Sequence, residues 1–173
     1  MSAVPGDPAS VSACASTVRS VAAHVEACGE PLASAVRDVS DGWTGRVSAT
    51  TRRRRGSLAA ATATTAAALD HVAVVLQDHA TDLADLHARA RRLDERVAAA
   101  GLDVRDGRVL PRLGVAGEAD AAADRHRADL AASLQEELDV ITARHARRRD
   151  WLVGVLRAST GELAAVSHAL RRG

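Results

Sequence analysis

The most informative property of this 173-residue chain is what it lacks. It has no Phe, Tyr, Lys or Asn, and its only aromatic residues are two Trp. RNA-recognition sheets and single-strand-binding grooves stack bases on aromatic side chains, so this composition argues against both. It also excludes a thick core built from aromatic rings. With a net charge of +1, the chain gives no electrostatic reason to expect nucleic acid or membrane as an obligatory partner.

The residues that are present favour long, closely packed helices. All 23 basic residues are Arg, and Ala occurs 39 times. Ala, Arg and Leu are among the strongest helix formers. The scarcity of residues with AT-rich codons also indicates a very GC-rich gene. We therefore expect an all-α protein.

Apolar spacing predicts a first helix that begins at Asp7-Pro8, with Asp as the N-cap and Pro at the first helical position. Pro31 is expected to kink this helix or to split it, and we favour a kink because the apolar pattern continues in phase. The pattern predicts this buried stripe: Val11, Cys14, Val18, Val21, Val25, Cys28, Leu32, Ala35 and Val39.

Cys14 and Cys28 lie on this predicted helix, fourteen residues apart. That spacing corresponds to about 21 Å, which is too far for a disulfide within one chain. We favour the interpretation that both are small buried residues. An intermolecular bridge is the alternative.

A second helix is predicted over residues 46–99, where no Pro interrupts the pattern. With the first it would form an antiparallel hairpin joined by a turn at 40–45, so residues 6–100 form the first predicted segment. Residues 101–117 follow Gly101 and contain Asp106-Gly107 between Val104 and Val109, which predicts a small β-hairpin or hairpin-like connector.

Residues 118–172 are again helical in pattern, as one long helix or two. Either Trp151 or Leu152, and either Val155 or Leu156, would belong to the apolar stripe. We expect this segment to pack on the hairpin and to extend it into an elongated three- or four-helix bundle. The longest uncharged stretch, 56–69, is too short and too polar for a membrane-spanning helix.

The sequence contains no recognisable catalytic or cofactor-binding motif, so we expect a protein that is not an enzyme and binds no metal or other cofactor. His71, His79 and His87 are spaced by eight residues, which rotates neighbours by about 80° and prevents them from converging on one metal. We interpret them as surface or interface histidines. No nucleophile elbow or phosphate-binding Gly loop is present.

The densest basic patch is Arg52, Arg53, Arg54 and Arg55, and a second lies at 147–149. The favoured interpretation of the first patch is a solvated face that pairs with acids such as Asp38, Asp41 or Glu162. Docking on an acidic partner or secretion component is the second possibility, and binding to nucleic acid or anionic lipid is the third.

Trp43-Thr44-Gly45 falls where the two long helices are expected to turn. A Trp ring can plug the open end of such a hairpin, and Gly permits a backbone conformation that other residues avoid. Here the chain resembles the WxG superfamily of type VII secretion substrates. It resembles in particular the actinobacterial secretion-signal domain found at the front of polymorphic toxins, which opens with Gly-Asp-Pro, here Gly6-Asp7-Pro8, and carries Trp-x-Gly, here Trp43 and Gly45. The resemblance covers about residues 6–100.

This resemblance implies a coiled-coil-like helical hairpin that binds another such hairpin, a secretion component or itself, and is exported without a cleaved signal peptide. The family's export signal, Tyr-x-x-x-Asp/Glu, is absent because the chain has no Tyr. Family toxins continue into a catalytic domain, whereas residues 118–172 are again helical in pattern. We therefore expect an export substrate or adaptor module without a toxin domain, made in the cytoplasm. Because residues 118–172 would cover the hairpin, we also expect a monomer. The alternative is a cytoplasmic helical scaffold or nucleic-acid-binding protein that uses Arg52–Arg55.

Overall fold

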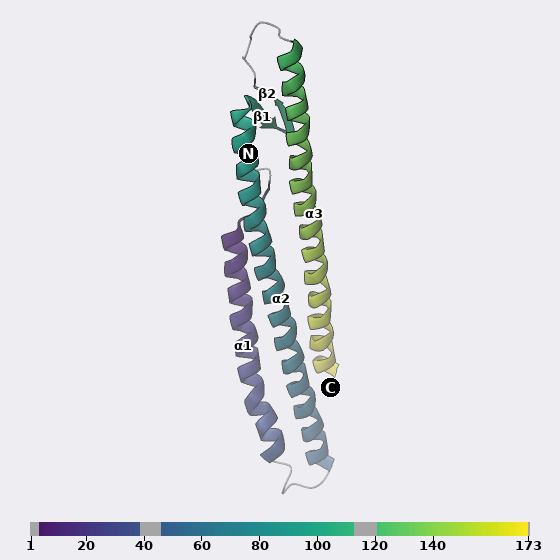
Figure 1. The fold of residues 1–173 in the computed structure, drawn as a ribbon. Coiled ribbons are helices and arrows are strands. Elements are labelled where there is room, and N and C mark those ends of the chain that lie inside the picture. The colour runs from purple at the N-terminus through teal and green to yellow at the C-terminus, as the bar shows by residue number, and fades with distance from the viewer. Residues whose placement is uncertain (1–3, 39–45, 113–120, 173) are drawn as a thin grey trace. The chain divides into compact units, whose positions relative to one another are not determined.

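The protein is all-α, and the residues that the structure describes form three long helices and one small antiparallel sheet (Figure 1). The computed structural model describes residues 4–38, 46–112 and 121–172. The elements are α1 (Pro8–Asp38), α2 (Arg46–Ala99), β1 (Leu102–Arg105), β2 (Arg108–Pro111) and α3 (Ala121–Arg172). The predicted fold class is confirmed, and α3 is one helix rather than two.

Helix α1 begins at Pro8, as the Asp-Pro pair predicts, and continues through Pro31 to Asp38. The helix is therefore not split at Pro31. The predicted β-hairpin is also confirmed, with Val104 opposite Val109 in the register. Its connecting residues, Asp106 and Gly107, have φ values of 52° and 75°. Two consecutive positive φ values define the turn that suits a tight hairpin, and Asp-Gly is a favoured pair for it.

Contacts divide the chain into two units. Unit 1 comprises Met1–Pro8 and Ala80–Asp150, and unit 2 comprises Ala9–His79 and Trp151–Gly173. The units cut across the three segments recognised in the sequence, because α2 and α3 each contribute residues to both. Each unit is described by itself below.

In unit 1, α2 and α3 run antiparallel, as two ion pairs show. Arg96 pairs with Glu137 at 2.6 Å, while the earlier Asp82 pairs with the later Arg148 at 2.6 Å. The core between them is built mainly from Leu side chains of both helices and is closed by the hairpin. Its buried members are Val4, Leu83, Leu86, Ala90, Leu93, Val97, Leu102, Val109, Leu134, Leu138 and Ile141.

In unit 2, α1 packs antiparallel on α2. The Ser12 hydroxyl donates a hydrogen bond to Gln77 at 3.0 Å, and farther along α1 a Cβ on Gly29 would meet Thr62. Val72, Val75 and Leu76 of α2 form a cluster with Ala15 of α1 and Leu152 of α3. Of the alternatives on α3, Leu152 is therefore the core residue, whereas Trp151 is exposed.

The predicted buried stripe of α1 is partly wrong. Val11 and Val18 pack on the core, but Cys14, Val21 and Cys28 are exposed. The buried positions are instead Ala15 and Ala22. The physical reason is the closeness of the helices, because small side chains let two backbones approach where Val would hold them apart. The interpretation of both cysteines as buried residues is corrected accordingly.

Candidate functional site

The Gly6-Asp7-Pro8 motif both starts α1 and anchors the segment before it. Gly6 has a φ of +110°, and a Cβ there would lie 3.1 Å from Cδ2 of Leu83. This conformation and close approach favour Gly. Just before it, Val4 is fully buried in the core of unit 1. The motif therefore joins a docked N-terminal segment to a helix start.

The Val4 backbone is held in place by a histidine of α2. His87 Nε2 lies 3.1 Å from the Val4 carbonyl oxygen. A carbonyl can only accept, so His87 Nε2 carries the proton and donates it. Sequence reasoning had treated His87 as a surface or interface residue and had not singled out Val4. A Val four residues before a helix start gives no periodic signal by itself.

Trp43 and Gly45 lie outside the described residues. The bounds of the neighbouring helices place them within the seven residues that separate the end of α1 at Asp38 from the start of α2 at Arg46. The Trp-x-Gly motif therefore falls, in the sequence, between the ends of two long helices.

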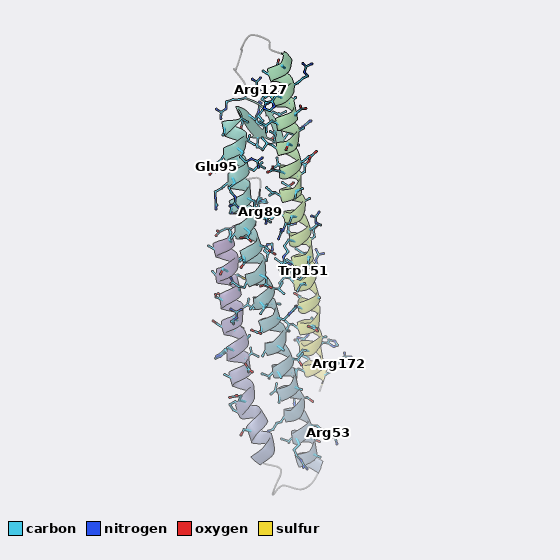
Figure 2. All side chains as sticks on the ribbon, in the orientation of Figure 1. Arg53, Arg89, Glu95, Arg127, Trp151 and Arg172 are labelled. Carbon is cyan, nitrogen blue, oxygen red and sulfur yellow. The ribbon has the colours of Figure 1, made fainter. Side chains whose placement is uncertain are left out.

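The basic patch Arg52–Arg55 lies near the start of α2 (Figure 2 labels Arg53). Arg52, Arg53 and Arg54 are exposed, and Arg55 is half-buried. Among the described residues, no ion pair joins Arg53 or Arg54 to Glu162, one of the expected acidic partners. The side chains of Asp38 and Asp41, the other two, lie outside the described part.

Arg53 and Arg54 border a groove of about 710 Å³ in unit 2. Its walls come from two helices and are partly apolar, with Leu58 on α2 and Val166 and Leu170 on α3, beside the hydroxyls of Thr50, Ser57 and Thr64. Leu58 and Leu170 are 37% and 40% exposed. The arrangement offers guanidinium groups beside an apolar surface, which suits an amphipathic anionic partner.

In the second basic run, 147–149, two of the Arg side chains form ion pairs. Arg148 Nε lies 2.6 Å from a carboxylate oxygen of Asp82, and Arg144 approaches the other oxygen at 3.8 Å. Arg149 pairs with its neighbour Asp150. Asp82 therefore links α2 to α3 in unit 1.

The three spaced histidines have three different environments. His71 is exposed, His87 is half-buried at the N-terminal segment, and His79 is buried with 7% exposure. Of the two interpretations, surface or interface, the surface one does not hold for His79. It lies on the buried side of α2, between Val75 and Leu83 along the chain. Among the described residues, no group of three or more His, Cys, Asp or Glu side chains is arranged to hold a metal ion.

Gln135 of α3 is an organising residue that sequence reasoning missed. Its Oε1 accepts a hydrogen bond from the Val109 N–H at 2.7 Å, and its Nε2 donates to the Gly107 carbonyl at 3.1 Å. Nε2 also lies 2.9 Å from Asp139. One side chain thus fixes the β-hairpin to α3. The only available signal was that Gln is rare here, since the chain has just Gln77 and Gln135.

Length and composition alone would allow the Ala49–Ala99 part of α2 to cross a membrane. The sequence had led us to expect no span. One such helix is weak evidence for a span, since core helices of water-soluble proteins pass the same test; here 22% of the apolar window is buried.

Comparison of the chain with protein-family models, curated proteins and solved structures gives no match.

Proposed function

We propose that the protein is a non-enzymatic helical substrate or adaptor of a type VII-like secretion system, with residues 6–100 acting as a WxG-type hairpin. The observation that carries this proposal is the position of Trp43-Thr44-Gly45 in the short connection between α1 and α2, which span 31 and 54 residues. The start of α1 at Pro8, directly after Gly6-Asp7, agrees with the same pattern.

The packing of α3 supports an adaptor that covers part of its own hairpin. Leu152 of α3 packs with Val72 and Val75 of α2 in unit 2. By resemblance, short WxG proteins recruit a partner to cover such an apolar face. Here α3 would take that place on α2, while Trp43 and the Arg52–Arg55 patch remain candidates for contact with secretion components.

Because the chain has no Tyr-x-x-x-Asp/Glu signal, its export requires that another protein supply the signal. In this proposal the signal comes from a partner hairpin, and the two proteins leave the cytoplasm together. Export should therefore require both the membrane ATPase of the system and a partner that bears the Tyr signal.

An export assay tests this proposal. The tagged chain is expressed in an actinobacterial host with and without the type VII ATPase, with and without a Tyr-bearing hairpin partner, and the culture filtrate is measured. We expect export only when both are present. Equal amounts in the filtrate of the strain without the ATPase would contradict the proposal.

Trp43→Ala should abolish or strongly reduce that export and lower helicity slightly, because the connection loses its largest apolar side chain. Trp151→Ala is the matched control, since Trp151 is 45% exposed and lies on α3. If both variants are exported like the wild type, Trp43 has no part in the function.

A second candidate function is a cytoplasmic scaffold that binds nucleic acid through Arg52–Arg55. The observation that favours it is the exposure of Arg53 and Arg54 without an ion pair to a described acidic residue. Such binding should weaken steeply with salt and disappear when the four Arg are replaced by Gln. Absence of DNA and RNA binding at low salt would exclude it.

A further inference from the structure

The groove that Arg53 and Arg54 border is formed by one face of α2 and the C-terminal part of α3, both in unit 2. We call it the α2–α3 groove. Ala60, Ala61 and Ala169 line it with single methyl groups, which leaves open the space that larger side chains would fill. Its volume of about 710 Å³ is in the range of small-molecule binding sites.

The charge along this groove has one sign. Arg53 and Arg54 are exposed, and none of the described residues that line the groove is Asp or Glu. Neither guanidinium forms an ion pair with a described acidic side chain. Guanidinium groups bind carboxylates through charge-assisted hydrogen bonds that are often bidentate. The groove therefore favours a ligand with an anionic head group.

Beyond the two Arg, the groove suits an alkyl chain better than a polar ligand. The hydroxyls of Ser57 and Thr64 each donate to a carbonyl of their own helix at 3.0 Å. An apolar group can therefore cover them without breaking a hydrogen bond, and a polar ligand finds their protons already used. Leu58 and Leu170, which are partly exposed, supply apolar surface whose burial is favourable.

The length of the groove matches a single extended chain. Arg54 and Thr64 are ten residues apart on α2, which corresponds to about 15 Å. An extended carbon chain gains about 1.2 Å per bond, as the polypeptide backbone does, so about 12 carbons span this distance. A peptide helix of the same length, 10–12 Å wide, occupies more than about 1,000 Å³. The groove is too small to enclose it.

We propose that the α2–α3 groove binds a single-chain anionic amphiphile of the fatty-acid class. Its carboxylate lies at Arg53 and Arg54, and its alkyl chain lies against Leu58 and Leu170. The inference goes beyond the secretion role and does not depend on it. Residues 50–64 of α2 contain no buried residue, so the ligand supplies apolar contacts that this stretch lacks in the protein alone.

Isothermal titration calorimetry with dodecanoate, kept below its micelle concentration, tests the site. The wild type should bind it at a single site. Replacing Arg53 and Arg54 together by Gln should raise the dissociation constant about tenfold or more, because the carboxylate loses its charge-assisted hydrogen bonds. Replacing Arg91 and Arg92 by Gln is the matched control, since they are also adjacent, exposed and on α2, and their loss changes the net charge equally. This control should bind like the wild type.

Ligand variants separate the head group from the chain. Dodecyltrimethylammonium has the same alkyl chain with a cationic head, and it should bind at least about tenfold more weakly. Shortening dodecanoate to decanoate should weaken binding by roughly tenfold, because two CH₂ groups are no longer buried. No binding of dodecanoate, equal binding of the cationic analogue, or equal loss in the Arg91 and Arg92 control would overturn the proposal.

The apolar wall is tested by Leu58→Glu, which places a carboxylate beside the two Arg and should abolish binding of dodecanoate. Val140→Glu is its control, since Val140 is 64% exposed on α3 in unit 1. Circular dichroism establishes that each variant keeps its helicity, and Leu170→Glu replaces Leu58→Glu if the latter does not fold. Unchanged affinity in the folded Glu variant would contradict the placement of the chain.

Amide hydrogen exchange locates the ligand. Dodecanoate should slow exchange at 50–64 and 166–170 and leave 83–97 unchanged. Slower exchange at 83–97 with no change at 50–64 would overturn the assignment. Phosphatidylglycerol vesicles provide the last comparison, because a chain that binds these vesicles but not dodecanoate would use the groove on a bilayer surface, and the proposal would be wrong.

Discussion

Gly29 lies at a close contact between α1 and α2, where the lack of a side chain lets the two helices approach. A Cβ at this position would lie 2.8 Å from Cγ2 of Thr62, which is closer than real Cβ atoms come. Thr62 is not free to turn away, because its Oγ1 donates to the Leu58 carbonyl at 2.8 Å. The contact lies in unit 2, on the side of α1 that also buries Ala22.

We therefore expect Gly29→Ala to destabilise the protein by about 1 kcal/mol or more, because overpacking outweighs the better helix propensity of Ala. The measurement is the midpoint of urea unfolding. Thr62→Ser removes the methyl group that clashes, so adding it to Gly29→Ala should recover most of the loss.

Gly161→Ala is the control for this experiment, since nothing lies within 4 Å of a Cβ at that position in α3. It should stabilise the protein by roughly 0.5–1 kcal/mol through helix propensity. If Gly29→Ala and Gly161→Ala both stabilise, the close approach of α1 and α2 does not exist in solution.

At the scale of elements, the β-hairpin is held to α3 by Gln135 rather than by apolar contacts alone. Leu102 and Val109 are buried in the unit 1 core, and within the described part of the chain the two strands pair only with each other. A two-stranded hairpin is marginally stable in water by itself. The two hydrogen bonds of Gln135 to Val109 and Gly107 therefore define where the hairpin rests.

Gln135→Ala should destabilise the protein by about 1–3 kcal/mol, because the part-buried Val109 N–H loses its acceptor. Amide hydrogen exchange at Val109 should become faster. Gln135→Glu should lie between the wild type and Gln135→Ala, since it keeps the acceptor but loses the bond to Gly107. Unchanged exchange at Val109 in both variants would contradict this role.

At the scale of the whole molecule, the two units have different cores. Unit 1 buries large side chains such as Leu83, Leu134 and Leu138 almost completely. The unit 2 cluster is smaller and includes Ala15 of α1. Residues 50–64 of α2 contain no buried residue, whereas five are buried between 83 and 97. Local stability follows buried apolar contacts.

We therefore expect amide exchange along α2 to be slow at 83–97 and much faster at 50–64, although both stretches belong to one helix. Mass spectrometry of proteolytic fragments after deuterium labelling measures this difference. In α3, which buries Leu134, Leu138 and Ile141, residues 134–141 should exchange more slowly than 160–170. Uniform protection along both helices would contradict the difference between the cores.

The sequence by itself determined the helices, their approximate ends and the hairpin. Asp7-Pro8, Gly101 and Asp106-Gly107 act through local backbone chemistry, which needs no tertiary partner. Apolar spacing also predicts a stripe along α2, and it is confirmed only in part. These members are buried: Val72, Val75, His79, Leu83, Leu86, Ala90, Leu93 and Val97. Leu58 is exposed, and Ala61, Thr65 and Ala68 are half-buried. The Trp-x-Gly pattern was found in the sequence, and its meaning stays a prediction.

Only the tertiary structure decided which side of α1 faces α2. Cys14 and Ala15 are neighbours, as are Val21 and Ala22, so heptad spacing fits either set and hydrophobicity favours the first. The close approach of the Ala- and Thr-rich part of α2 instead selects Ala15, Ala22 and Gly29, because larger side chains would hold the helices apart. The more apolar set, Cys14, Val21 and Cys28, is left exposed.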